Sequence, residues 1–232
     1  MQIDRWYTRR MEKPRLVDMS KSREGMERHE HWSVTEVFSE ARDEERGSED
    51  AYLVTDHCIA VFDGVSTPGG KKQEGMTPGQ FAVETVKRAI AGNPGLRAED
   101  TAPFVTESLR AAVREKGMED TPSLVFVAFF PKQNRIVRVG DCMFLIDGVG
   151  HNPGIMPDRA KAEIRRRILD KELNLGASED ALIRHDPSRE RVRSLRNWQH
   201  THANNPDSRD FGYGVVNGEG DHRIDRDQDR QR

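Results

Sequence analysis

The sequence predicts an α+β fold in which antiparallel β-strands pack in layers against amphipathic helices. Short runs rich in β-branched and aromatic residues are separated by short polar links, a pattern typical of strands joined in hairpins. Two longer segments between these runs carry apolar residues at helical spacing. Each strand has a mainly apolar face and each helix one apolar stripe. Because both must be buried, layered packing is expected.

Six segments are expected to form strands: residues 34–38, 51–55, 59–63, 123–130, 135–140 and 143–147. The second and third are separated by Asp56 and His57, and a short polar link of this kind indicates a hairpin with a tight turn. The last three follow one another with short connections, so a three-stranded meander is predicted there.

Two helices are expected between the third and fourth strands, near residues 78–91 and 102–116. Thr77 is suited to the N-cap of the first helix, and Pro78 to its first helical position. The run Asn93-Pro94-Gly95 is expected to end that helix, because proline and glycine interrupt helical structure.

Composition divides the chain into an extension at residues 1–32, a folded domain at 33–218 and a charged tail at 219–232. The tail has too few apolar residues to bury a face and is expected to be disordered. Within the domain, residues 160–173 have the pattern of a basic amphipathic helix, and residues 179–201 indicate one or two more. The basic helix either presents a solvated face, the favoured interpretation, or binds an acidic surface.

The composition excludes several classes of protein. The net charge of −3 argues against a protein held to nucleic acid by its electrostatic field. No stretch approaches the ~20 apolar residues of a membrane-spanning helix, and the N-terminal residues lack the apolar core of a secretion signal. Cys58 and Cys142 lie within apolar runs, which favours buried free thiols, with one disulfide between them as the alternative. A cytoplasmic protein without nucleic-acid or membrane partners is therefore predicted.

Acidic residues occur at three strand ends. Glu49 and Asp50 precede one strand of the predicted hairpin, Asp63 and Gly64 end the other, and Asp141 lies between two later strands. In a hairpin, the start of the first strand and the end of the second lie at the same end of the sheet, so the first two groups are expected to converge. Carboxylates without His or Cys partners are hard oxygen ligands, which suit Mg²⁺ or Mn²⁺ rather than zinc.

The alternative is that these are ordinary turn residues, because Asp and Gly are common at strand ends. Asp147 and Gly148 also end a predicted strand, and we assign that pair to the alternative. For the other three groups, their order and spacing taken together favour a shared site.

Two runs of sequence are similar to the signatures of the PPM (type 2C) family of metal-dependent protein phosphatases, and specifically to its bacterial branch. RGSEDAYLVTDHCIAVFDGVSTPGG, residues 46–70, resembles the family's opening, where a strand after an acidic pair is followed by one ending in Val-Phe-Asp-Gly. PSLVFVAFF and RIVRVGDCMFLIDG, within residues 122–148, resemble its second signature. The resemblance extends over about residues 34–218. It implies a four-layer α-β-β-α sandwich of antiparallel sheets, here incomplete.

The resemblance also implies an activity, namely hydrolysis of phosphoserine or phosphothreonine in a phosphoprotein substrate by a water molecule activated between two Mg²⁺ or Mn²⁺ ions. It assigns five residues to the metal ions: Glu49, Asp50, Asp63, Gly64 and Asp141. Asp63 corresponds to the carboxylate that bridges the two ions and is expected to lie nearest the centre. Arg46 is the nearest arginine to the position that holds the substrate phosphate.

Several departures from the family pattern concern this site. The family's phosphate-binding arginine corresponds to Glu45, so Arg46 is shifted by one position, and Ser48 and Cys142 replace the usual Asn and Ser. After Gly218 the sequence has neither the family's Thr-Asp-Gly nor its final Asp-Asp or Asp-Asn pair, as a truncation or a shifted reading frame would produce. We expect one weak metal position at best. The alternative is a catalytically inactive pseudophosphatase or fragment that acts as a protein-binding module.

Overall fold

The computed structural model describes residues 28–29, 32–33, 47–65, 71–72, 74–151, 156–205 and 214–219. The chain divides into two compact units, Met1–Val37 and Phe38–Arg232. In the first unit, two short strands pair antiparallel: β1 (Arg28–His29) and β2 (Trp32–Ser33). The strand predicted at residues 34–38 lies outside the described residues, as does the predicted tail beyond Glu219.

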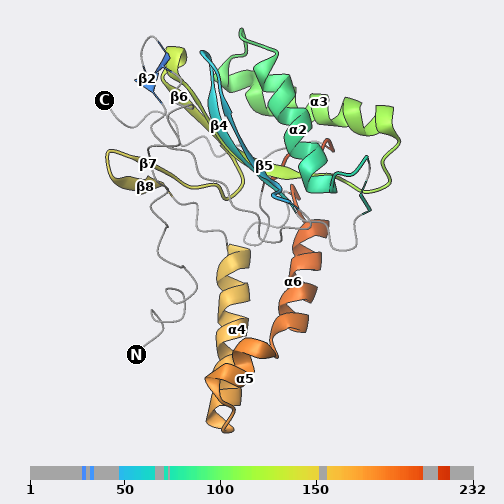
Figure 1. The fold of residues 1–232 in the computed structure, drawn as a ribbon, viewed down its shortest axis with the longest axis vertical. Helices are drawn as coiled ribbons and strands as arrows, with labels where there is room; N and C mark the ends of the chain where they lie inside the picture. The colour runs from blue at the N-terminus through green and yellow to red at the C-terminus, as the bar shows by residue number, and fades with distance from the viewer. Residues whose placement is uncertain are drawn as a thin grey trace. The chain divides into compact units, whose positions relative to one another are not determined.

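The second unit contains a four-stranded antiparallel sheet in which successive strands are neighbours (Figure 1). Its strands are β3 (Asp50–Val54), β4 (Ile59–Gly64), β5 (Leu124–Phe130) and β6 (Arg135–Val139). They confirm four of the predicted strands closely. The predicted hairpin is also confirmed, because β3 and β4 pair along their whole length with Val54 opposite Ile59 beside the turn. A 3-10 turn, η3 (Pro131–Gln133), connects β5 to β6.

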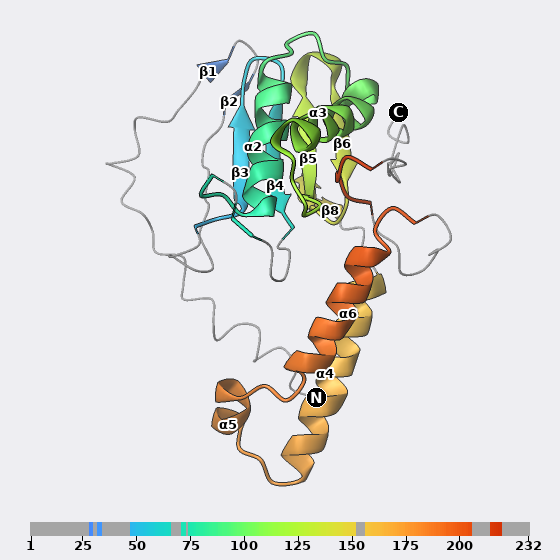
Figure 2. The same cartoon turned by 90° about the vertical axis from the view of Figure 1, so that its right-hand side faces the viewer.

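Helices α2 (Pro78–Ala91) and α3 (Thr101–Lys116) confirm the two predicted helices. A 3-10 turn, η2 (Ala98–Asp100), leads into α3. The helices pack on each other and lie over one face of the sheet (Figure 2). The core between helices and sheet is built from alternate strand residues together with the apolar helix stripes, and its largest members are Phe62, Phe126, Phe130, Ile90, Leu109 and Leu124. Because strand side chains alternate, the intervening strand residues lie on the other face.

The predicted three-stranded meander is wrong in its third strand. That strand, β7 (Phe144–Ile146), pairs with β8 (Val149–His151) in a separate two-stranded sheet and not with β6. Between them Asp147 and Gly148 both have positive φ, of 51° and 80°, which suits a two-residue hairpin turn. The assignment of this pair to an ordinary turn is therefore consistent with the structure. After β6 the chain changes direction at Gly140, whose φ is 86°, and so leaves the sheet.

Three further helices follow: α4 (Met156–Asn174), α5 (Glu179–Arg184) and α6 (Arg189–Thr201). They agree with the helices predicted in this part of the chain. α4 and α6 lie side by side in both views (Figures 1 and 2), and Lys161 Nζ donates a hydrogen bond of 3.0 Å to Gln199 Oε1 between them. After α6, Val216 forms an antiparallel bridge with Leu124 at the start of β5.

The structure confirms the α+β class with antiparallel sheets. Of the four layers that the resemblance implies, the described residues provide a sheet and the helices over one of its faces. Both cysteines are free, as predicted, with Cys58 fully buried and Cys142 partly buried. Among the helices in the described residues, none is long and apolar enough to span a membrane.

Candidate metal centre

The pairing of β3 with β4 brings two of the predicted site residues together. Asp50, the first residue of β3, lies directly opposite Asp63, the last but one of β4. Phe62 and Gly64 point into the core, so Asp63 lies on the face of the sheet away from the helices. The two carboxyl groups are therefore close to each other, and their like charges repel.

Asp63 is the most perturbed carboxyl group of the cluster. Its pKa is raised from 3.8 to about 7, first by desolvation and then by the negative charges of Asp50 and Asp141, the hydrogen bond with Asp50, and the charge of Glu49. The side chain keeps access to solvent on one side, yet its neighbour on β5 is the buried Val125. Low local hydration and like charges both disfavour the ionised form. The charges of Asp50, Asp141 and Glu49 therefore all act on Asp63.

Glu49 approaches this cluster but is also held by the start of α2. Its Oε1 accepts a hydrogen bond from the Thr77 hydroxyl, and its backbone carbonyl accepts one of 3.1 Å from the Gly64 N–H. A carboxylate at a helix N-terminus is favoured by the helix dipole. Among the three acidic residues that raise the pKa of Asp63, Glu49 has the smallest effect. The sequence did not predict the hydrogen bond between Glu49 and Thr77, because that bond depends on how the start of α2 packs against the start of β3.

Gly64 is required by packing. A Cβ atom at this position would lie 2.7 Å from the Glu49 carbonyl oxygen and 2.9 Å from the backbone carbonyl group of Gly79. Backbone atoms cannot move aside as a flexible side chain can, so β4 and the first turn of α2 can approach this closely only with glycine here. This requirement is independent of the predicted role of the Gly64 carbonyl as a metal ligand.

Asp141 joins the cluster from the turn after β6. Its pKa is raised by desolvation and by the charge of Asp158, while a backbone hydrogen bond and the positive charge of Lys161 act in the opposite direction. Lys161 is itself paired with Asp158 at 2.6 Å, at the start of α4. These two residues were not predicted for the site, because only tertiary structure brings the start of α4 near Asp141.

Cys142 also belongs to this environment. The pKa of its thiol is raised to about 12, mainly by desolvation and then by the charges of Asp63, Asp141 and Asp50. It packs with the buried Val125 and Val215, which together cover this end of the sheet. In the sequence, Cys142 replaces the serine that is usual in the family. Because it directly follows Asp141, the sequence alone indicated that it lies near the site.

The strand register places Asp50 opposite Asp63, and the charges of Glu49 and Asp141 also act on Asp63. Gly64 directly follows Asp63, and Arg46 lies outside the described residues. In the described part of the chain, no group of three or more His, Cys, Asp or Glu side chains is arranged to hold a metal ion. The donor chemistry nevertheless fits Mg²⁺ or Mn²⁺, since every charged group converging on Asp63 is a carboxylate. The charges of these carboxyl groups act on Asp63, but the groups do not surround one point at which a metal ion would be fully coordinated.

Thr77 links this centre to the fold and provides a test of local geometry. Its hydroxyl accepts a hydrogen bond from the Gln80 N–H and donates one to Glu49, while Gln80 Oε1 accepts from the Thr77 N–H, which completes a capping box. Thr77→Ala is expected to lower the free energy of unfolding by about 1–2 kcal/mol, because the cap and the bond to Glu49 are both lost. Thr77→Ser should retain most of the stability. Urea denaturation measures both, and equal losses would contradict the capping role.

Neither a protein-family model nor a curated protein matches this chain. Three solved structures similar to parts of it are mycobacterial serine/threonine phosphatases. The PstP/Ppp phosphatase of Mycobacterium tuberculosis aligns over 76% of this chain and 64% of its own, with 16% identity and a TM-score of 0.39. The PstP catalytic domain in complex with two manganese ions aligns over 46% and 48%, with 15% identity and a TM-score of 0.31. The PPM phosphatase MsPP of Mycobacterium smegmatis, in complex with cacodylate, aligns over 46% of each chain, with 22% identity and a TM-score of 0.31.

The present chain thus spans less than two thirds of the length of each of these structures.

Proposed function

We propose that the carboxyl cluster is the divalent-cation centre of a PPM-type phosphatase that hydrolyses phosphoserine and phosphothreonine in proteins. The observation that carries this proposal is the convergence of three acidic side chains on Asp63, whose pKa they raise together with desolvation. Like charges placed this close are unfavourable unless a proton or a cation lies between them. The two runs that resemble the family's signatures contain these same strand ends. This supports a bound cation, rather than a proton alone, between the carboxyl groups.

Each residue would have a role set by its position in the fold. Asp63, at the centre, would contact the cation directly, with Asp50 across the hairpin, Asp141 from the turn after β6, and the Gly64 carbonyl as an uncharged ligand. Arg46 would hold the substrate phosphate. When bound, the divalent ions lower the pKa of a water molecule and neutralise the phosphoryl oxygens. The free thiols suit a reducing compartment, so we place the protein and its phosphoprotein substrates in the bacterial cytoplasm.

The centre of this chain is expected to bind its ion weakly. Glu49 already accepts a hydrogen bond from Thr77, and the described carboxyl groups do not surround one point. Mg²⁺ gives up its water ligands reluctantly and needs well-placed anions in exchange. Slow hydrolysis follows from these deficits, because each removes positive charge from the reacting phosphate.

The test is hydrolysis of p-nitrophenyl phosphate and of phosphoserine and phosphothreonine peptides in the presence of Mn²⁺. We expect the 232-residue chain to react only slightly faster than its Asp63→Ala variant. Appending strands that carry the missing Thr-Asp-Gly and Asp-Asp elements should raise turnover by orders of magnitude, and Asp63→Ala should remove that gain. Asp147→Ala is the matched control, because Asp147 also precedes a glycine at a strand end but lies in the β7–β8 turn.

Two results would contradict the proposal. If the extended chain gained no activity, the carboxyl cluster would not be a phosphatase centre. If the 232-residue chain alone turned over rapidly and lost this activity in Asp63→Ala, the centre would be complete without the missing carboxylates.

A further inference from the structure

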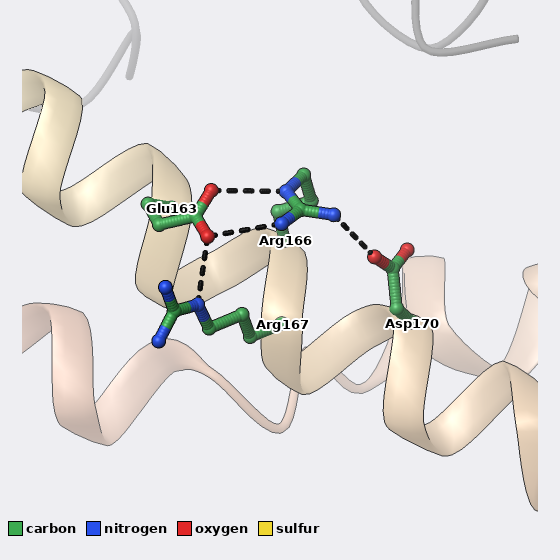
Figure 3. A network of polar contacts seen from close by, with 4 residues as sticks. All are labelled: Glu163, Arg166, Arg167 and Asp170. Atoms are coloured by element: carbon green, nitrogen blue, oxygen red, sulfur yellow. Dashed lines mark hydrogen bonds and ion pairs between the residues drawn. The ribbon is translucent and has the colours of Figure 1, made fainter. Parts of the chain in front are cut away.

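Two arginines of the basic run of α4, Arg166 and Arg167, are paired with acidic side chains of their own helix (Figure 3). The Arg166 guanidinium donates hydrogen bonds of 3.0 and 2.9 Å to Glu163 and one of 2.9 Å to Asp170. Arg167 Nε donates to the same Glu163 at 2.7 Å. Arg166 and Arg167 also hold the pKa of Glu163 at about 2, so this carboxylate remains charged. The surface predicted from sequence to be basic therefore has little uncompensated charge to offer a partner.

α6 differs from α4 in this respect. Arg189, Arg193 and Arg196 recur at intervals of four and three residues, so they lie on one side of the helix, and all three are exposed. We call these three residues the α6 arginine stripe. No ion pair joins them to an acidic side chain in the described parts of the chain. Glu190 is the only acidic residue of α6. It lies three residues before Arg193 and is therefore its neighbour on the helix surface, but no ion pair joins the two in the described residues.

The nearest acidic group before α6 is already engaged. Asp186 pairs with Arg165 of α4 at 2.9 Å and accepts hydrogen bonds from the backbone and hydroxyl of Ser188. The charge of Arg189 also acts on Asp186, without forming an ion pair among the residues that the structure describes. The packed side of α6 is fixed by the buried Gln199, which accepts the hydrogen bond from Lys161. Gln199 lies three residues after Arg196, so this hydrogen bond anchors α6 to α4 beside one end of the stripe.

We propose that the α6 arginine stripe is a docking surface for a short acidic segment of a partner protein. Guanidinium groups bind carboxylates through paired hydrogen bonds and remain charged at any physiological pH. Along a helix axis, the steps from Arg189 to Arg193 and on to Arg196 are about 6 and 4.5 Å. Side chains on one face of an extended peptide repeat at about 6.6 Å, so acidic residues at alternate positions can reach successive arginines.

A protein segment fits this stripe better than nucleic acid does. The chain carries a net charge of −3, which weakens the long-range attraction of any polyanion. The stripe extends over only about 10 Å of helix and contains no aromatic side chain, whereas single-stranded nucleic acids are held by longer basic grooves with stacking platforms. Docking at the stripe does not depend on the carboxyl cluster or on any hydrolysis there.

The test measures fluorescence anisotropy of a labelled decapeptide of alternating Glu and Ser with the full chain at low ionic strength. The peptide should bind, and a matching Gln-Ser peptide should not. The double variant Arg193→Gln/Arg196→Gln should weaken binding about fivefold or more, since exposed charge pairs each contribute a modest amount. The control Arg166→Gln/Arg167→Gln removes the same charge from paired arginines of α4 and should change binding by less than about twofold. Far-UV circular dichroism verifies that both variants keep their helices.

Three results would overturn the proposal. One is no binding of the acidic peptide to the unmodified chain. Another is an equal loss in the two double variants, which would show a response to net charge alone. The third is binding of a single-stranded oligonucleotide at least as tight as that of the peptide and dependent on Arg193 and Arg196, which would make nucleic acid the ligand of the stripe.

Discussion

Replacing Asp63 with Asn is expected to stabilise the metal-free protein above neutral pH and to abolish its stabilisation by Mn²⁺. The folded chain holds the Asp63 proton more tightly than the unfolded chain, because the pKa is raised from 3.8 to about 7. Stability should therefore fall as the pH rises between these two values, and remain lower above them. Asn cannot ionise, so the variant avoids this loss. We expect a gain of about 1 kcal/mol above pH 7, because solvent on one side screens much of the repulsion.

Mn²⁺ should reverse the order of stability. A cation that binds the folded chain through Asp63 raises its melting temperature further as the free Mn²⁺ concentration increases relative to the Kd, and Asp63→Asn removes a ligand. Thermal unfolding in EDTA and in Mn²⁺, at acidic and alkaline pH, measures both effects. Asp147→Asn makes the same carboxyl-to-amide change in the β7–β8 turn and should leave the response to Mn²⁺ unchanged. A variant Asp63→Asn that is less stable in EDTA at alkaline pH, or that keeps the Mn²⁺ response, would refute this account of the cluster.

Gly140→Ala is expected to be among the most destabilising single substitutions near the site. A Cβ atom here would lie 2.2 Å from Val125 Cγ1 and 2.9 Å from the Gly214 carbonyl oxygen, and the backbone φ of 86° is unfavourable for any other residue. The overlap and the backbone strain together should lower the free energy of unfolding by about 2–4 kcal/mol. Because Gly140 directly precedes Asp141, the same change should displace this carboxylate and weaken Mn²⁺ binding.

Gly117→Ala separates the two causes. Gly117 also has positive φ, 60°, but an added Cβ would meet no atom within 4 Å. Only the backbone strain remains there, and the expected loss is about 1 kcal/mol. Guanidinium denaturation of both variants gives the comparison. Similar losses at the two positions would show that the close approach of Gly140 to Val125 does not constrain the fold.

The fold was largely predictable because its strands and helices are local. The hairpin of β3 and β4 follows from two apolar runs with a short polar link, and the start of α2 follows from Thr77 and Pro78. Once the hairpin is known, the convergence of Asp50 and Asp63 follows from antiparallel geometry without further information. Those features of the site depend on pairing between neighbours in sequence, which periodicity can reveal.

The remaining features depend on contacts between distant segments. β7 leaves the sheet because Gly140 turns the chain and because Asp147 and Gly148 favour a separate hairpin. The hydrogen bond between Glu49 and Thr77 requires the end of the hairpin to meet the start of α2. No local pattern encodes where such segments meet.

The charge pattern of α4 and α6 shows the same limit. Both helices are rich in arginine, and composition alone does not distinguish them. Within α4, Arg166 forms ion pairs with Glu163 and Asp170. In α6, Glu190 lies three residues before Arg193 but forms no ion pair with it in the described residues. Because Glu163 to Arg166 and Glu190 to Arg193 have the same spacing, helical spacing alone does not separate the two surfaces.

The central claim is that a divalent cation binds, weakly, among Asp50, Asp63 and Asp141. Paramagnetic broadening of backbone amide resonances by substoichiometric Mn²⁺ tests it most directly. Broadening falls steeply with distance from the ion, so the amides of these three residues and their neighbours should disappear first, while those of α6 persist. Asp63→Asn should abolish the selective loss, and Asp147→Asn should not. Broadening centred on another acidic segment, such as Glu179 and Asp180 of α5, or spread evenly over the chain, would contradict a metal centre at this end of the sheet.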